Sequence, residues 1–165
     1  MKKILVASHG WLADGIKSSV GILTGNQDLI TAVNAYVDES DYTATIQEFI
    51  DSVKPDDDAV IFTDIYGGSV FQKVMLLEPE KKGIVHVTGF NLAAVIETLI
   101  RTDPITPELM DQIVQDASGL MQRMECVSDS MAATDGEGCD DDFLSRKSSI
   151  GRWEGVSIDR SGSSG

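Results

Sequence analysis

Short runs of β-branched and apolar residues alternate with amphipathic helical patterns through about the first 120 residues of this 165-residue chain. Such alternation is typical of βαβ units, in which parallel strands form one sheet covered by helices on both faces. The pattern predicts strands at 3–8, 29–37, 59–63 and 84–88, and helices at 11–23, 41–53, 70–77, 91–100 and 107–119. We therefore expect an α/β fold with an open, mostly parallel, doubly wound sheet in flavodoxin-like strand order.

The periodic pattern ends near residue 127. From Ser128 onward acidic and small residues predominate, and neither helical nor strand periodicity is visible. We predict one folded domain at 1–127 and a polar, acidic, flexible tail at 128–165. The closing Ser161–Gly165 run is typical of a remnant of cloning.

The chain is strongly acidic, with a formal net charge of −14 and a sequence pI of about 4.3. Such a chain repels nucleic acid and anionic lipid, and its field favours encounter with a basic protein. No apolar run approaches the roughly 20 residues that span a bilayer, and no secretory leader is evident. Cys126 and Cys139 match no metal or redox spacing. We expect a cytoplasmic protein without membrane insertion, metal or cofactor.

Two polar residues stand just past the carboxyl ends of predicted strands, His9 after the first and Asp64 after the third. Ligands and chemistry collect at that edge of a parallel sheet. Imidazole can act there as a neutral nucleophile near pH 7, and a carboxylate that accepts its Nδ1 proton leaves Nε2 free to react. A lone histidine is more often structural, and an aspartate before a helix is often its N-cap.

The segment Gly67-Gly68-Ser69 precedes a predicted helix and supplies the third part of this hypothesis. Glycines at a helix N-terminus expose amide groups in positive potential, which favours an anion such as phosphate. We predict phosphate contacts from Gly67, Gly68 and Ser69, and from Gly10 beside the histidine. Taken alone, a Gly-Gly-Ser sequence is usually a plain turn.

Several rival chemistries lack their required residues. The chain contains neither a P-loop sequence nor a G-x-G-x-x-G sequence after a strand. A histidine phosphatase would need a second catalytic histidine with arginines around it. The second histidine here, His86, lies inside the fourth predicted strand, where we expect a structural or edge histidine.

Three segments in this order, Ile4–Gly10, Thr63–Ser69 and Val87–Leu92, make residues 1–127 resemble the mannose-type IIA component of the bacterial phosphotransferase sugar-uptake system. The resemblance implies that the phosphocarrier HPr phosphorylates His9 at Nε2 and that a IIB component receives the group. It implies support from Asp64 and phosphate contacts from Gly67-Gly68-Ser69. No metal is required, because the donor already carries an activated phosphoryl group.

The chain departs from the family pattern at two places. Val70 and Phe71-Gln72 stand where a proline and an asparagine are usual, and Ala93 stands where a proline is usual. The family also forms homodimers by exchanging a final antiparallel edge strand, and residues 120–127 are the segment in register for it.

The sequence therefore predicts a phosphoryl-relay protein of sugar import, a phosphotransferase component with a phosphohistidine intermediate. Two alternatives share its histidine and fold: a IIA-like subunit that relays phosphate to a dihydroxyacetone kinase, and a regulatory domain controlled by phosphorylation. A third is a flavodoxin-like binding module without a covalent step.

Overall fold

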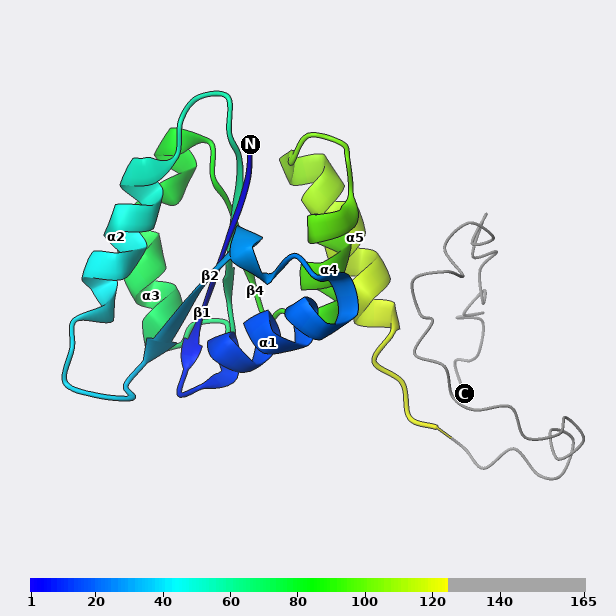
Figure 1. Ribbon diagram of the computed structural model, residues 1–165, viewed down its shortest axis with the longest axis horizontal. Helices are drawn as coiled ribbons and strands as arrows, with labels where there is room; N and C mark the ends of the chain where they lie inside the picture. Colours follow the sequence, from blue (N-terminus) through cyan, green and yellow to red (C-terminus); the bar gives the residue numbers. More distant parts are fainter. Residues whose placement is uncertain (125–165) are drawn as a thin grey trace, which may run out of the picture. The chain divides into compact units, whose positions relative to one another are not determined.

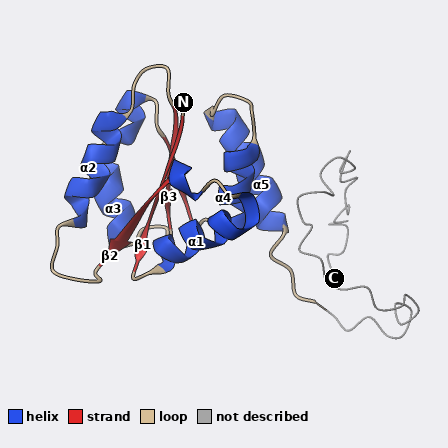
Figure 2. Cartoon of the chain, in the orientation of Figure 1, coloured by secondary structure: helices blue, strands red, loops and turns tan. Residues whose placement is uncertain are grey.

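The computed structural model describes residues 1–124, and their centre is a four-stranded sheet (Figure 2). Its strands are β1 (Lys2–His9), β2 (Ile30–Ala35), β3 (Asp58–Thr63) and β4 (Val85–Thr88). All neighbouring pairs are parallel, and the order across the sheet is β2-β1-β3-β4. This arrangement confirms the predicted α/β class with its doubly wound, flavodoxin-like order.

Helices cover both faces of the sheet (Figure 1). One layer contains α1 (Leu12–Thr24), α4 (Leu92–Ile100) and α5 (Pro107–Gly119), and the other contains α2 (Tyr42–Ser52) and α3 (Ser69–Leu76). Single 3₁₀ turns at Gln27–Leu29 and Pro79–Lys82 precede β2 and β4. Within the described part of the chain, no helix is long and apolar enough to cross a membrane.

The alternation of side chains along β1 explains why both faces are covered. Ile4 and Val6 belong to the apolar cluster under α1, α4 and α5, whereas Leu5 and Ala7 belong to the cluster under α2 and α3. All four are fully buried. A strand that is apolar on both faces needs a helical layer on each side, and the central strand β1 therefore fixes the three-layer architecture.

Capping residues mark the starts of α2 and α4 and the end of α1. Asp41 accepts the backbone N–H of Thr43 at the start of α2. Asn91 accepts from Ala94 at the start of α4, and Gly25 ends α1 in the left-handed region with φ 73°. Each contact satisfies a backbone group that the helix itself leaves unpaired.

The second strand is shorter than the predicted 29–37. It starts at Ile30, because Gln27–Leu29 form a 3₁₀ turn, and it ends at Ala35, because Tyr36 takes a left-handed backbone with φ 65°. The apolar pattern continues through this turn, so it extends the predicted strand beyond the true one. The left-handed turn at Tyr36 lies beside the candidate site.

The predicted exchange strand, 120–127, falls partly inside the described residues. Leu120–Met124 have no regular secondary structure within the single chain. The rest of that segment, the domain boundary at 127, the tail and both cysteines lie outside the described residues. The exchanged strand and the boundary remain predictions.

Candidate functional site

Strand register brings His9 and Asp64 together. β1 and β3 are adjacent and parallel, and Ala7 pairs with Thr63, so β1 ends two residues beyond the end of β3 at the same edge of the sheet. His9 is the last residue of β1, and Asp64 is the first residue after β3. The helices that follow these strands, α1 and α3, lie on opposite faces of the sheet. Loops that diverge in this way open the crevice in which α/β proteins bind ligands.

Asp64 holds the imidazole of His9 from one side. Its Oδ2 atom lies 2.8 Å from the backbone nitrogen of His9 and 2.9 Å from His9 Nδ1. Its Oδ1 atom accepts the N–H of Ile65 at 2.9 Å. Because an ionised carboxylate can only accept hydrogen bonds, Nδ1 carries the ring proton and Nε2 keeps its lone pair.

The surroundings of Asp64 favour its ionised form. The carboxylate side chain is 8% exposed and the imidazole 37% exposed. Burial raises the pKa of Asp64, but the hydrogen bonds from the backbone and imidazole of His9 outweigh burial and lower it below its ordinary value. The carboxylate is therefore charged at neutral pH. It is positioned to stabilise positive charge on the imidazole.

Asp64 is not the N-cap of the following helix, so the alternative role that the sequence offered for this aspartate does not apply. α3 begins at Ser69, and its N-cap is Gly68, four residues beyond Asp64. The carboxylate contacts His9 and Ile65 instead.

The other side of the imidazole faces the segment 67–69. Ser69 Oγ lies 3.0 Å from His9 Nε2. A β-carbon at Gly68 would lie 3.4 Å from His9 Cε1 and 3.2 Å from the Ile65 carbonyl, so a glycine permits this close approach. Gly67 has φ 74°, a backbone that favours glycine. The segment therefore reaches the nitrogen that would react.

The two helix N-termini beside the site differ in their free donors. At α1, Ser8 Oγ accepts the N–H of Ala13 at 2.8 Å, and Asn34 Oδ1 accepts the N–H of Asp14 at 3.2 Å. At α3, the first N–H with a partner inside the helix turn is that of Gln72, which donates to Gly68. Within residues 1–124, the N–H groups of 69–71 have no acceptor, so α3 presents the open anion-binding end.

The backbone N–H of Gly10 is engaged within the sheet. The φ of Gly10 is 59°, and its N–H donates to the carbonyl of Ala35 at 2.9 Å. This contact ties β1 to β2. A phosphate contact from Gly10 stays a prediction, whereas the start of α3 has unpaired N–H donors beside His9.

Tyr36 belongs to the site, although sequence reasoning missed it. Its ring lies 5.6 Å from the His9 ring, nearly parallel at 19°. The sequence pattern places this residue inside a strand. A parallel pairing of the first two strands, with His9 opposite Ala35, is the signal that would have placed the next residue beside the imidazole.

His86 has a structural role, as the sequence predicts. It lies on the edge strand β4, its Nε2 is 2.9 Å from Thr63 Oγ1, and its ring packs on Phe71 at 5.4 Å. Burial lowers the pKa of His86 to about 4, although Glu80 acts in the opposite direction. This histidine is neutral at physiological pH, and its nitrogen is already engaged.

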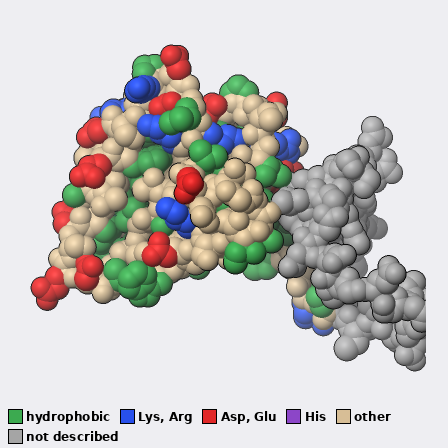
Figure 3. Space-filling view, in the orientation of Figure 1, with side chains coloured by type: hydrophobic (Ala, Val, Ile, Leu, Met, Phe, Trp, Pro, Cys, Tyr) green, Lys and Arg blue, Asp and Glu red, His purple; other side chains and the backbone are tan. Residues whose placement is uncertain are grey.

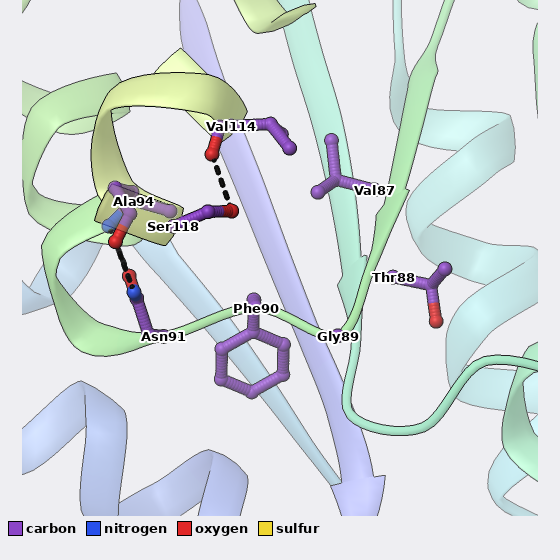
Figure 4. A pocket seen from close by; sticks show the side chains of 9 residues that line it. Val87, Thr88, Gly89, Phe90, Asn91, Ala94, Val114 and Ser118 are labelled. Carbon is purple, nitrogen blue, oxygen red and sulfur yellow. Dashed lines mark hydrogen bonds between the residues drawn. The ribbon is translucent and has the colours of Figure 1, made fainter. Parts of the chain in front are cut away.

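A hollow separate from the surroundings of His9 lies at the carboxyl end of β4, between the 88–91 loop and α5 (Figure 4). Its lining includes the hydroxyl groups of Thr88 and Ser118 and the amide of Asn91, and no titratable side chain. Asn91 accepts the N–H of Ala94 in α4 and donates to the carbonyl of Ala117 in α5. Ser118 donates to the carbonyl of Val114, and the dashed lines mark its contact and that of Asn91 with Ala94 (Figure 4). The paired side chains of His9 and Asp64 lie elsewhere, at the ends of β1 and β3.

Comparison with known proteins gives consistent matches. The family model for the PTS system fructose IIA component matches residues 3–114. Among solved structures, phosphotransferase system component EIIA from Streptococcus agalactiae is 27% identical, with a TM-score of 0.62 over 74% of this chain and 97% of that chain.

Two further structures extend the comparison. A proposed permease of the phosphoenolpyruvate-dependent sugar phosphotransferase system from Klebsiella pneumoniae is 27% identical, with a TM-score of 0.66 over 74% of this chain and 90% of that chain. The mannose/sorbose-specific IIA subunit from Enterococcus faecalis is 21% identical and shares the fold, with a TM-score of 0.64 over 76% of this chain and 96% of that chain.

Proposed function

This chain belongs to the IIA component family of the sugar phosphotransferase system, and we propose that it relays a phosphoryl group through Nε2 of His9. The donor is the phosphocarrier HPr, and the acceptor is a IIB component of the transporter. The observation that carries the proposal is the imidazole held at Nδ1 by Asp64, with Nε2 facing Ser69 at 3.0 Å. We place this relay in the cytoplasm.

In the transfer, the Nε2 lone pair of His9 attacks the phosphorus of the phosphohistidine on HPr. The Nε2–P bond forms as the donor N–P bond breaks, and the electron pair of the broken bond stays on the donor nitrogen. The imidazole becomes positive, and its Nδ1 proton stays on the ring, shared with Asp64. The transfer to IIB repeats these steps with His9 as the donor.

Catalysis in this scheme rests on positioning and on fixed dipoles. While Nε2 is free, the Ser69 hydroxyl donates to its lone pair. Once phosphorus occupies Nε2, that hydroxyl is released and donates to a phosphoryl oxygen. The unpaired N–H groups at the start of α3 offer further donors to the three oxygens of the group.

Charge supports a basic protein as the donor. The whole chain carries −14, and acidic side chains lie along the side of the molecule that α2 forms (Figure 3). Opposite net charges accelerate the encounter of two proteins. Addition of salt should therefore slow the bimolecular step with HPr more than it slows the transfer within the complex.

Intact mass spectrometry tests the proposal. The chain is incubated with phosphoenolpyruvate, enzyme I and HPr, and its mass should rise by one acid-labile phosphoryl group. His9→Ala should abolish the gain, and the matched control His86→Ala should keep it. A label that survives in His9→Ala and is lost in His86→Ala would overturn the assignment.

The acceptor is tested in the same mixture. Purified IIB component should remove the phosphoryl group from His9. Transfer to a dihydroxyacetone kinase instead would identify the related relay, and transfer to neither acceptor would favour a regulatory domain.

A further inference from the structure

We propose that Tyr36 is a positioning residue for phosphoryl transfer, whose ring fixes the plane of the His9 imidazole. The inference deepens the proposed function and rests on it. It draws on the backbone at residue 36, on the stacking with His9 and on the contact between the phenols of Tyr36 and Tyr42.

The backbone of Tyr36 is strained. Among the described residues, Tyr36 and Glu78 are the non-glycine residues with positive φ, at 65° and 49°. The left-handed region is unfavourable for an L-residue with a β-carbon, because that carbon crowds the following carbonyl oxygen. Such a conformation persists where the surroundings require it, and it often marks a site of function.

Core packing does not account for this strain, because Tyr36 is 60% exposed. Its position is set by the residue before it. Ala35 ends β2 opposite His9, and its carbonyl accepts the N–H of Gly10. The left-handed turn at the next residue then lays the tyrosine ring against the imidazole, 5.6 Å away and nearly parallel.

Three contacts together hold the imidazole. Asp64 binds Nδ1 and Ser69 meets Nε2, so both act at the rim of the ring. Tyr36 acts on its face. The face of an aromatic ring is also electron-rich, so it favours the positive imidazole that forms during transfer.

A second tyrosine holds the ring of Tyr36 from its far end. The hydroxyl of Tyr42 donates to the hydroxyl of Tyr36 at 3.1 Å. The two rings also meet edge to face, with their centroids 5.3 Å apart. Tyr42 starts α2, so the position of the Tyr36 ring is tied to that helix as well as to the end of β2.

Two substitutions separate the ring from the hydroxyl. Tyr36→Phe keeps the ring, whereas Tyr36→Asn removes it and keeps a residue that accepts the left-handed backbone. Glu78→Asn is the matched control, because it changes the other non-glycine residue with positive φ. Phosphorylation is followed with two donors, phosphorylated HPr and the small molecule phosphoramidate.

We expect Tyr36→Asn to slow single-turnover phosphorylation about tenfold or more with both donors, since misplacement of a reacting group is costly. Tyr36→Phe should recover most of that loss, and Glu78→Asn should match the wild type. In NMR spectra, the ring-current shift of the His9 Hε1 proton should vanish in Tyr36→Asn and persist in Tyr36→Phe. Thermal unfolding of all variants should confirm a folded protein.

Each contrary result has one meaning. Tyr36→Asn within twofold of the wild type would overturn the inference and leave the role of His9 intact. A loss confined to HPr would make Tyr36 a docking residue and would also overturn it. A wild-type chain that takes no phosphoryl group from either donor would overturn the proposed function itself.

Discussion

Two histidines in this chain have opposite environments, and the difference lies in what each ring nitrogen contacts. His9 has a carboxylate at Nδ1 and a small hydroxyl at Nε2. His86 has Thr63 at Nε2, an aromatic ring against its face and a pKa of about 4. The first arrangement is the one that the proposed phosphoryl transfer requires, and the second keeps a neutral ring in a half-buried position.

At this scale, we predict that Asp64→Asn slows transfer to His9 by about 10²–10⁴, because the corresponding change in a catalytic triad costs about 10⁴. The amide lacks the charge that stabilises a positive imidazole. Whichever way the asparagine side chain is turned, its NH₂ group would also face the backbone N–H of Ile65 or of His9, which places two donors against each other. Rapid-quench measurement with phosphorylated HPr gives the rate.

Asp56→Asn is the control for Asp64, because it removes an equal charge from an exposed turn before β3. It should transfer at the wild-type rate. Unchanged single-turnover kinetics in Asp64→Asn would show that the carboxylate has only a structural role.

We also predict that His86 makes stability depend on pH between about 6.5 and about 4. In that window the unfolded chain binds a proton that the folded chain does not, so stability falls as pH falls. The loss is on the order of 2 kcal/mol, after allowance for the partial exposure of the ring. Urea unfolding at both ends of the window measures it.

His86→Asn isolates this contribution, because asparagine can still hydrogen-bond Thr63 but does not titrate. The wild type should lose more stability than the variant as the pH falls. Equal losses in both proteins would show that His86 titrates normally in the folded state.

At the scale of elements, the segment before α3 contains two glycines that are required for different reasons. Gly67 has φ 74°, and a β-carbon there would have no atom near it. Gly68 has φ −68°, and a β-carbon there would crowd Ile65 and His9. Gly67→Ala should therefore lower the free energy of unfolding by about 1 kcal/mol through backbone strain. Gly68→Ala should chiefly slow phosphorylation of His9.

Each glycine variant controls for the other. Chemical denaturation gives the stability of both, and single-turnover transfer gives their rates. The explanation would be wrong if Gly68→Ala transferred at the wild-type rate, or if both variants lost the same stability.

The elements themselves could largely be predicted from the sequence, because both faces of the sheet are buried and the apolar runs of β1 and β3 are unambiguous. His9 and Asp64 could be paired for the same reason, since parallel strands share one carboxyl edge. Tyr36 could not, because a tyrosine after an apolar run favours more strand. The left-handed turn there depends on contacts with β1 that no local pattern contains.

At the scale of the whole molecule, β2 and β4 are the two edges of the sheet that residues 1–124 form, and the neighbour of β4 there is β3. An unpaired edge strand is usually covered. We predict a homodimer in which residues 120–127 pair with the partner's sheet. A chain that ends at residue 128 should remain dimeric by light scattering, and one that ends at residue 118 should become monomeric or insoluble. A soluble, phosphorylatable monomer ending at residue 118 would refute the exchanged strand and leave the chemistry of His9 standing.

The site also draws on the ends of three strands, with His9 as the last residue of β1, Tyr36 after β2, and Asp64 and Ser69 after β3. The contact of His9 with Asp64 joins residues 55 apart in the sequence. A nascent chain that has left the ribosome only as far as β2 therefore contains His9 but not yet Asp64 or Ser69, the residues that contact its two ring nitrogens. Under the proposed function, the capacity to accept phosphate should arise only once the sheet has assembled, and the phosphorylated fraction of a sample should then count its natively folded molecules.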